Sequence, residues 1–398
     1  MKIAIVQEQI DLRRGGAETS VIEMARRLVE LGQDVTLVVA EGGGGAEGEV
    51  GVKIAEMPIG SGSKVVRAIR FVAQADRYCR ENDFKIIHAV TPCFSCNVYQ
   101  PRGGTYVETV NRSVARAGGF FTRLIKRLGR RFNRRQRFLY LVERGLLTGR
   151  PQPYVAAVSE YVARQVYEAF PQFPKRRVRV IFNGVDLESR SSEALDRLRA
   201  ETRAKYDVSA DRPLLLFVAH NFKLKGLREL IDAMALPALA SPNALPGDVR
   251  QHSPLLFVLG RDRSQPYERQ VRRLGLEDRV RFIGPASDLT PFYAAADVLV
   301  HPTWYDPCSR VVLEALGVGL PVVTTRVNGA SEVMAEGTHG VVVDSPADLA
   351  ASAQAIFKCM SPELRAACRA AAPAMRERLS MARHARELVK LYEEIQNC

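Results

Sequence analysis

Several features are missing from this sequence, and each absence removes a class of protein. No apolar run reaches the roughly 18 residues that a membrane-spanning helix needs. The first apolar stretch, Ile3–Val6, meets the polar residues Gln7–Gln9 too soon to form the apolar region of a signal peptide. The seven cysteines are an odd number scattered over 398 residues, which does not suit a disulfide framework. We therefore expect a cytoplasmic protein.

Motifs for common nucleotide cofactors are absent too. No Gly-x-Gly-x-x-Gly follows the first predicted strand and no Walker lysine motif occurs, so the sequence does not support a dehydrogenase or a P-loop NTPase. Cys93 and Cys96 form one Cys-x-x-Cys next to His88. A zinc site would need a fourth ligand and usually a second knuckle, and neither is visible. The spacing favours buried thiols over zinc or redox chemistry, and we expect no metal site.

The positive charge of the sequence is concentrated in one segment. The chain has 57 Lys and Arg against 44 Asp and Glu, a formal net charge of +13. Residues 111–150 hold 12 basic residues and one acidic residue, whereas residues 1–110 sum to −1 and residues 151–398 to +3. An anionic partner is therefore expected at this segment rather than over the whole surface.

The basic segment has the pattern of an amphipathic helix, with Phe120, Leu124, Leu128 and Phe132 at four-residue spacing. Much of the remainder is basic: Arg123, Lys126, Arg127, Arg130, Arg131, Arg134 and Arg135. This combination suits the surface of an anionic membrane. Two alternatives stay open. The stripe could pack on its own domain beneath solvated charges, or the charges could bind nucleic acid, although no nucleic-acid-binding motif accompanies them.

Short apolar strands alternate with helical patterns along the chain, which predicts parallel sheets wrapped by helices. The first series has strands at 3–6, 35–39, 86–90, 155–158 and 178–182 and helices at 17–31, 64–79 and 159–170. The second has strands at 214–219, 255–259, 280–283, 298–300, 321–324 and 340–343 and helices at 227–235, 267–274 and 309–316. The predicted fold class is α/β, with two doubly wound Rossmann-like domains.

These patterns also suggest where the domains begin and end. We predict an N-terminal domain at 1–186 that includes the basic insert 111–150, a polar linker at 187–212, and a C-terminal domain at 213–375. A last helix at 376–398 could pack back on the N-terminal domain. Ligands of doubly wound sheets bind at the carboxyl ends of strands, so a cleft between the two domains is the expected site.

Two loops that come after predicted strands have features of anion sites. Gly15 and Gly16 precede the first helix, where backbone N–H groups and the helix N-terminus can approach an anion. A simple glycine turn explains them equally well. The loop Asn221–Gly226 follows the first strand of the second domain. Its two lysines, Lys223 and Lys225, are well placed to hold a diphosphate, the alternative being a solvated loop.

The segment His301–Glu314 is the most specific in the chain. Asp306 followed by Pro307 predicts a helix N-cap with proline at the first helical position. Glu314 would then lie roughly 12 Å along a similar face of that helix. Carboxylates so spaced suit a hexose at the helix tip and a ribose further along. The alternative, a capping Asp and a surface Glu, is disfavoured because an unpaired acid in the apolar run Val311–Leu316 would be costly.

With these motifs, the chain resembles the retaining glycosyltransferases of family 4, which have the GT-B fold. Among bacterial members it is most similar to the lipopolysaccharide-core glucosyltransferase I group. The resemblance covers nearly the whole chain. It runs through Gly15-Gly16, the Lys225-Gly226 donor loop, Asn183–Asp186, Asp306–Glu314 and Gly319–Thr325.

The resemblance implies a role for each motif. Gly15 and Gly16 would face the donor phosphate and sugar, and Lys225 would bind the diphosphate. Glu314 would take the ribose hydroxyls. Asp306 stands where the family usually has its first Glu, which orients the transferred sugar. The other residues on the donor side are Asn221, Lys223, Pro307, Cys308 and Ser309.

Two histidines occupy positions of interest in this family. His220 stands where the family commonly has an Arg, five residues before Lys225, so Lys223 would supply the second positive charge. His88, at the carboxyl end of a strand, resembles the acceptor-side residue of some members. A loop histidine with satisfied hydrogen bonds is an equally good interpretation of His88.

The resemblance implies transfer of a hexose, with glucose first, from a nucleotide diphosphate sugar such as UDP-glucose to a membrane-anchored saccharide such as a lipopolysaccharide core. Retention at the anomeric carbon would come from front-face departure, without a protein nucleophile, metal ion or cofactor. The enzyme would work as a peripheral protein at the inner face of the cytoplasmic membrane and bind no nucleic acid. Two alternatives are a nucleotide-sugar epimerase of the same fold and a non-catalytic anionic-lipid-binding protein.

Overall fold

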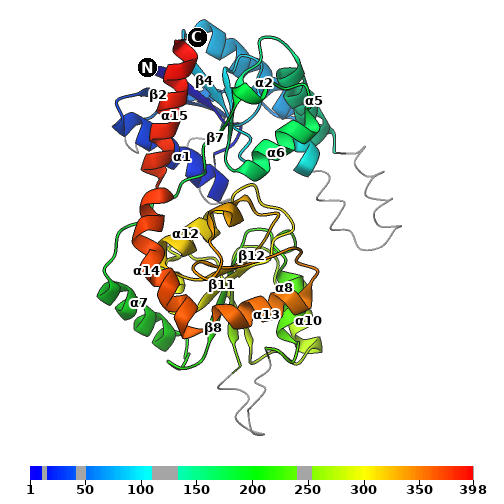
Figure 1. Cartoon of the computed structure of the whole chain (residues 1–398). Coiled ribbons are helices and arrows are strands. Elements are labelled where there is room, and N and C mark those ends of the chain that lie inside the picture. Colours follow the sequence, from blue (N-terminus) through cyan, green and yellow to red (C-terminus); the bar gives the residue numbers. More distant parts are fainter. Residues whose placement is uncertain (11–15, 42–50, 110–132, 240–252, 398) are drawn as a thin grey trace. The chain divides into compact units, whose positions relative to one another are not determined.

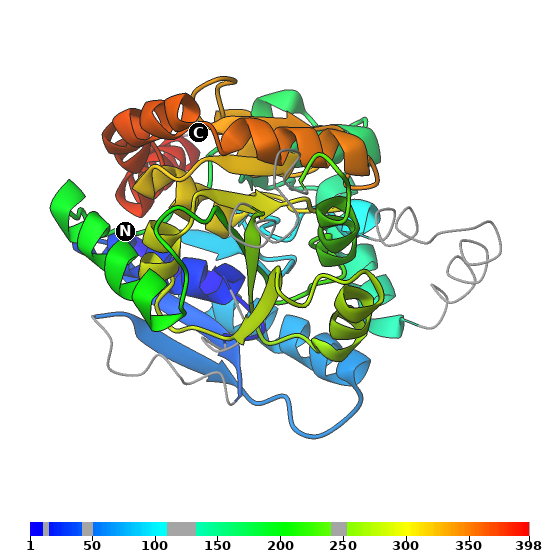
Figure 2. The same cartoon turned by 90° about the horizontal axis from the view of Figure 1, so that it is seen from below.

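The computed structural model of the chain describes residues 1–10, 16–41, 51–109, 133–239 and 253–397 (Figures 1 and 2). It divides into two compact units. Unit 1 comprises Met1–Asp186 together with Ser380–Cys398, and unit 2 comprises Leu187–Leu379. No helix among the described residues is both long and apolar enough to cross a membrane.

The described part of unit 1 contains a parallel sheet with the strand order β3-β2-β1-β4-β5-β6-β7. Its strands are β1 Lys2–Val6, β2 Asp34–Ala40, β3 Lys53–Met57, β4 Ile86–Ala89, β5 Val98–Tyr99, β6 Tyr154–Ala157 and β7 Val178–Val180. Its helices are α1 Gly16–Glu30, α2 Lys64–Glu81, α5 Arg134–Thr148, α6 Glu160–Ala169 and α15 Met381–Gln396, with a 3-10 turn, η2, at Lys175–Arg177. The strand order reverses between β1 and β4, which is the topological switch point of this sheet.

The core of unit 1 joins residues from the two ends of the sequence. Ile3 and Ile5 of β1 point to the same face because side chains alternate along a strand, and both are completely buried. Helices α1 and α15 contact each other, and Leu388 and Tyr392 of α15 share the core with β1. The last helix is therefore an integral part of the first unit.

The described part of unit 2 contains a parallel sheet with the order β10-β9-β8-β11-β12-β13. Its strands are β8 Leu214–Val218, β9 Leu255–Leu259, β10 Val280–Gly284, β11 Val298–His301, β12 Val322–Thr325 and β13 Gly340–Val343. Its helices are α7 Ser192–Lys205, α8 Leu227–Met234, α10 Gln265–Arg273, α11 Thr290–Ala295, α12 Arg310–Val318, α13 Leu349–Cys359 and α14 Pro362–Arg378, with a 3-10 turn, η3, at Gly329–Val333. The switch point of this sheet lies between β8 and β11.

Helices pack on both faces of this second sheet, as a doubly wound domain requires. Helix α13 contacts α8, and α10 contacts α8, whereas α12 contacts α14 and α11 contacts α7 (Figure 1). The strands are buried on both faces and are accordingly near-continuous apolar runs, such as Leu214–Val218 and Leu255–Leu259.

Two parts of the structure differ from the prediction. Segment 187–212 is not a plain linker, since it contains α7, whose Arg199 and Arg203 bind the Asp297 carboxylate of unit 2. The C-terminal segment 376–398 is not one helix, because α14 ends at Arg378 in unit 2 and α15 belongs to unit 1. Within the predicted insert 111–150, α5 packs against α2. Residues 111–132 of that insert lie outside the described residues.

Candidate functional site

The two loops at the switch point of unit 2 contact each other. One loop follows β8 and the other follows β11, so both stand at the carboxyl edge of the sheet. The Trp304 amide donates to the Leu224 carbonyl at 2.9 Å, and the Thr303 hydroxyl donates to the same oxygen at 3.3 Å. This edge is where doubly wound sheets bind their ligands.

Gly226 allows this close approach. Its φ of +79° lies in the left-handed region, and a Cβ there would stand 2.0 Å from the Pro302 carbonyl oxygen. Any other residue would therefore push the two loops apart. Helix α8 starts directly after this glycine. The loop Asn221–Gly226, called the lysine loop below, therefore leads straight into the helix N-terminus.

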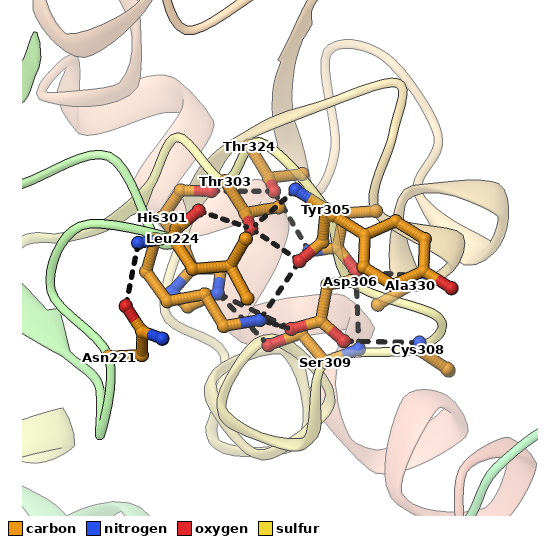
Figure 3. A network of polar contacts seen from close by, with 12 residues as sticks. Asn221, Leu224, His301, Thr303, Tyr305, Asp306, Cys308, Ser309, Thr324 and Ala330 are labelled. Carbon is orange, nitrogen blue, oxygen red and sulfur yellow. Dashed lines mark hydrogen bonds and ion pairs between the residues drawn. The ribbon is translucent and has the colours of Figure 1, made fainter. Parts of the chain in front are cut away.

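Lys225 and Asp306 form the central contact of the site. Figure 3 shows Asp306 in the polar network around it. The Lys225 ammonium donates to Asp306 Oδ2 at 2.5 Å and to the Tyr305 carbonyl at 3.2 Å. His301 Nε2 lies 3.6 Å from the same carboxylate oxygen. The two charged side chains are only 18% and 12% exposed, so water screens the pair weakly.

The pKa values of this cluster reflect that pairing. Burial on its own raises the pKa of Asp306, but the charge of Lys225 and the hydrogen bonds from His301 and Lys225 outweigh burial, and the net pKa is well below its ordinary value. Burial and the charge of Lys225 lower the pKa of His301. Asp306 is therefore a carboxylate and His301 a neutral imidazole near neutral pH.

Asp306 is not the helix cap that the sequence predicts. Helix α12 begins at Arg310 with Ser309 at its N-cap, three residues after Asp306. The backbone of Asp306 instead pairs with residues 327–329, accepting from the Gly329 amide at 2.9 Å. Its Oδ1 accepts from the Cys308 amide at 3.2 Å. The predicted helical spacing from Asp306 to Glu314 is therefore wrong, because only Glu314 lies on the helix.

Glu314 is neither a surface acid nor an unpaired one. Its side chain is 14% exposed. Oε2 accepts from the Tyr293 hydroxyl at 2.7 Å, and Oε1 accepts from the Arg310 guanidinium at 3.1 Å. Burial and the charge of Glu314 raise the pKa of Tyr293 well above its ordinary value, so the phenol remains a donor. These two contacts orient the carboxylate within α12.

The remaining donor-side predictions fall on the same two loops. The Asn221 side chain accepts from the Leu224 amide at 2.9 Å, which shapes the lysine loop. Lys223 is exposed, whereas Cys308 is buried. The Ser309 hydroxyl lies 3.4 Å from His301 Nε2. Pro307 stands between Asp306 and these residues in the same turn.

Sequence reasoning missed Asn328, which holds the Asp306 turn together. Its Oδ1 accepts from the Ser309 and Ala330 amides at 3.2 and 3.1 Å, and its Nδ2 donates to the Thr324 hydroxyl at 3.0 Å. The signal was the Asn328-Gly329 pair just beyond a predicted strand, which marks a turn but does not reveal its partner.

A neighbouring cavity of about 450 Å³ was also missed. It lies at the carboxyl ends of β9 and β10 and is lined by Phe222, Val258, Gly260, Arg261, Asp262, Ser264, Glu268 and residues 282–285. Asp262 Oδ2 accepts from the Phe222 amide at 2.9 Å, which links this cavity to the lysine loop. Burial, followed by the charge of Arg261, lowers the pKa of His220. His220 stands where the family commonly has an arginine, and the guanidinium of Arg261 is close enough to affect its pKa.

The switch point of unit 1 holds a different kind of cluster. Gly15 lies outside the described residues, and Gly16 is the first residue of α1. His88 is completely buried, and its Nδ1 lies 2.6 Å from the Tyr392 hydroxyl of α15. Burial and the charge of Arg102 lower the pKa of His88 to about 3. His88 is therefore neutral and buried in this structure, and its acceptor-side role stays a prediction.

Arg102 holds the polar interior next to His88. Its guanidinium donates to Asn183 Oδ1 at 2.6 Å and to Gln100 Oε1 at 2.7 Å, and it also donates to the Ser20 hydroxyl. Ser20 belongs to α1, and Asn183 belongs to the motif Asn183–Asp186. This network joins α1 to the segment after β7, which explains why that motif matters to the fold.

Only part of the predicted membrane surface can be placed. Arg123, Lys126, Arg127, Arg130 and Arg131 lie outside the described residues. Arg134 is exposed at the start of α5. Arg135 forms an ion pair with the buried Glu8, so it contributes to unit 1 rather than to a free basic surface. The prediction for Arg135 is corrected accordingly.

The Cys-x-x-Cys pair lies inside unit 1. Cys93 and Cys96 are both buried. The hydrogen bond with Cys96, together with burial, raises the pKa of Cys93 well above its ordinary value, so this thiol stays protonated. Within the described ranges, no three His, Cys, Asp or Glu side chains are arranged to hold a metal ion.

Solved structures show the fold that these two units define. The crystal structure of WaaG, a glycosyltransferase involved in lipopolysaccharide biosynthesis, aligns with a TM-score of 0.75 at 23% identity, over 94% of this chain and 98% of that one. Anabaena HepE in complex with UDP and glucose aligns with a TM-score of 0.68 at 21% identity, over 99% and 100%. Two Rossmann-like α/β domains of this kind define the GT-B fold.

Family models agree with the fold. The model described as Glycosyltransferase Family 4 matches residues 14–189, and the model described as Glycosyl transferases group 1 matches residues 198–375. The chain belongs to the family 4 glycosyltransferases, as the motifs of its sequence predict.

Curated relatives point in the same direction. Lipopolysaccharide glucosyltransferase WaaG of Escherichia coli (strain K12) is 27% identical over 294 residues, which is 74% of this chain and 73% of that protein. Lipopolysaccharide core biosynthesis glycosyltransferase LpsE of Rhizobium meliloti (strain 1021) is 34% identical over 171 residues, or 43% of this chain and 44% of that protein.

Proposed function

We propose that this glycosyltransferase moves a hexose, with glucose as the first candidate, from a UDP-linked donor to a membrane-anchored saccharide such as a lipopolysaccharide core. The anomeric configuration would be retained. The two curated relatives support the acceptor class, since both are described as lipopolysaccharide enzymes. Anabaena HepE, which was solved with UDP and glucose, supports the donor class.

The contact between Lys225 and Asp306 carries this proposal. A donor diphosphate has more negative charge than one carboxylate, so it would compete for the Lys225 ammonium at the strand edge. Lys223 and the N–H groups at the start of α8 would add positive potential beside it. The Asp306 carboxylate, once released from Lys225, would accept hydrogen bonds from hydroxyls of the transferred sugar.

The same residues would stabilise the departing diphosphate. A fixed ammonium and oriented N–H groups favour the charge that develops as the sugar leaves, and they need no reorganisation at that moment. We expect them to supply this stabilisation without a metal ion. Front-face departure would let a diphosphate oxygen take the proton of the acceptor hydroxyl, so the reaction would not need a protein nucleophile.

Glu314 would recognise the ribose. Its carboxylate already accepts hydrogen bonds from Tyr293 and Arg310, and each carboxylate oxygen can accept more than one. The ribose hydroxyls would use the remaining acceptor sites. Arg261 and the 450 Å³ cavity after β9 and β10 lie beside the lysine loop and offer room for another part of the donor.

The basic segment would bring the enzyme to its acceptor. Each basic residue near the surface would contribute about 1 kcal/mol of binding free energy to anionic lipid. Five of the predicted ones lie close together in the sequence: Arg123, Lys126, Arg127, Arg130 and Arg131. An epimerase would leave this segment without a role, and the curated relatives WaaG and LpsE are glycosyltransferases. Both points favour transfer over epimerisation.

A ligand panel tests the donor assignment. Thermal unfolding of the full chain would be measured with UDP, GDP and ADP and with their glucose derivatives, since a bound ligand raises the melting temperature. We expect the largest shift with UDP compounds. Release of UDP from UDP-glucose and transfer to a lipopolysaccharide core acceptor would then be measured. If no nucleotide raises the melting temperature and no sugar is transferred, the proposal is wrong.

Liposome co-sedimentation tests the membrane assignment. We expect binding to vesicles that contain anionic lipid and little binding to neutral vesicles. Reversal of Arg123, Lys126, Arg127, Arg130 and Arg131 to Glu should abolish it. A matched control reverses five exposed basic residues elsewhere, Arg176, Lys205, Arg272, Arg273 and Arg326. Equal loss in both variants would mean that only net charge matters, and the proposed membrane surface would be withdrawn.

A further inference from the structure

Unit 2 has a second charged site, at the edge of the sheet opposite Lys225 and Asp306. Asp297 directly precedes β11 and Pro321 directly precedes β12, so both mark the amino edge of this parallel sheet. A cavity of about 230 Å³ opens there. This volume is below the ~300–1,000 Å³ of pockets that enclose drug-sized molecules, so the cavity suits a small ligand.

One face of helix α14 supplies most of the positive charge of this cavity. Arg365, Arg369 and Arg376 are spaced by four and seven residues, which places them in one row along the helix. Ala372 and Pro373 lie in the same row and leave space between the guanidinium groups. Gly319 at the end of α12 lets α14 approach, because a Cβ there would stand 2.8 Å from the Arg369 Cα.

The buried centre of the site has three arginines around one carboxylate. Asp297, with 4% of its side chain exposed, contacts Arg199 at 2.6 Å, Arg203 at 2.7 Å and Arg365 at 2.8 Å. The Leu214 amide also donates to it at 2.8 Å. One carboxylate balances only one of the three guanidinium charges, so an excess of positive charge remains at low exposure.

The helix carbonyls beside the cavity, which would repel an anion, accept hydrogen bonds from arginines. The C-terminal carbonyls of α11 accept from Arg199, with Ala295 at 2.8 Å and Ala296 at 3.0 Å. Gly317 near the end of α12 accepts from Arg376 at 3.0 Å. The N-terminal turn of α7 also lines the cavity, and the positive end of its dipole favours an anion.

Two further arginines of the cavity, Arg369 and Arg190, have weaker ion pairs than those around Asp297. Within the described part of the chain, Arg369 has Asp196 as its acidic partner at 3.9 Å, and both side chains are more than half exposed. Arg190 donates to the exposed Glu188 at 2.7 Å, while its Nε is buried without a hydrogen-bond partner. Guanidinium groups with free donors are the groups that bind phosphate in a bidentate way.

We propose that the arginine cavity at the amino edge of the unit 2 sheet binds a small phosphate-bearing anion, separately from the donor site. Four arginines line it: Arg190, Arg365, Arg369 and Arg376. The phosphate group would replace the missing negative charge beside Asp297. Either inorganic phosphate or a small phosphorylated metabolite has this chemistry.

Phosphate binding to the full chain, measured by calorimetry at constant ionic strength against chloride, tests the proposal. Because phosphate could also bind at Lys225, four proteins are compared. We expect saturable binding in the wild type, in Lys225→Ala and in the control Arg272→Ala/Arg273→Ala. Arg190→Ala/Arg369→Ala should bind ~10-fold more weakly or worse, since it loses charged hydrogen bonds.

Arg369→Glu provides a second variant that should fold, because this residue is half-exposed and has only a distant partner. It should weaken binding at least as much as the double variant. Glucose 6-phosphate serves as the second probe. Tighter binding than inorganic phosphate assigns a phosphorylated metabolite, and equal binding assigns the phosphate ion itself. Binding that is lost in Lys225→Ala but kept in both cavity variants, or that never saturates, would overturn the proposal.

Discussion

The two sheets of this glycosyltransferase have the same doubly wound topology but opposite chemistry at their switch points. In unit 2, an ammonium and a carboxylate meet on loops after β8 and β11 and form a largely buried ion pair. In unit 1, the strands β1 and β4 lead to a buried interior in which His88 is neutral and bonded to Tyr392. One architecture thus supports a charged site in one unit and a packed polar core in the other.

The difference lies in where the polar side chains stand, since Lys225 and Asp306 are on loops after strands and His88 is within β4. Unit 2 places two loops of its own chain against each other through Gly226. Unit 1 packs α15, the last helix of the sequence, against the face of the sheet that carries His88. Function in this fold therefore depends on which side chains the strands and their loops carry, and not on topology.

Lys225→Ala should have the largest effect on the charged side of this comparison. We expect kcat with a nucleotide sugar to fall about 100- to 1,000-fold, as for loss of one group that stabilises developing charge. The matched control is Lys223→Ala in the same loop. Because Lys223 is exposed, its removal should lower kcat less than about fivefold. Equal effects of the two variants would contradict the special position of Lys225.

A second prediction uses the opposite pH dependence of the two units. Burial raises the pKa of Glu143, beside Tyr99 in unit 1, to about 7 from an ordinary 4.5. The folded protein therefore keeps a proton that the unfolded chain has lost, and stability falls as the pH rises from 4.5 to 7. Asp306 has a lowered pKa, so its contribution is present above about pH 3.8 and is lost as the pH falls further.

Glu143→Gln should remove the pH dependence of the stability of unit 1. In the wild type, its free energy of unfolding should fall by on the order of 3 kcal/mol between pH 4.5 and pH 7.5. Urea unfolding followed by far-UV circular dichroism at several pH values measures it. Trp304, the one tryptophan of the sequence, reports on unit 2 alone through its fluorescence. A wild-type unit 1 whose stability does not fall over this range would disprove the assignment.

Tyr293→Phe should produce an intermediate effect at the donor site. It removes one donor from Glu314 without changing charge, and hydrogen bonds to charged groups contribute ~1.5–3 kcal/mol. We expect weaker binding of UDP, measured by calorimetry, and a smaller change for free diphosphate. The same loss for UDP and diphosphate would show that Glu314 does not recognise the nucleoside part.

Tyr392→Phe should have the smallest effect. It deletes the hydroxyl that meets His88 and leaves the ring packing in place, so unit 1 should lose ~1 kcal/mol. The circular dichroism transition should shift, whereas the Trp304 fluorescence transition should not. Turnover should stay close to that of the wild type at 25 °C. A large loss of turnover with no loss of stability would instead support an acceptor-side role for His88.

Sequence patterns were informative where burial is local. Runs such as Leu214–Val218 and Leu255–Leu259 predicted strands that the structure contains, because a strand buried on both faces must be apolar throughout. Helix α7 was missed because its buried side chains include Thr202 and Arg203 rather than an apolar stripe. Strand β5 was missed because Val98–Tyr99 is too short to form a pattern.

The sequence by itself determined the class of this protein: two parallel α/β domains, a lysine loop, and a motif from Asp306 to Glu314 that identifies the family. Tertiary structure alone decided how those residues are used. The contact of Lys225 with Asp306 spans 81 residues and that of His88 with Tyr392 spans 304, so no local pattern encodes either. Burial and pairing at such distances set charge states, and these decide which polar residues serve a site and which serve a core.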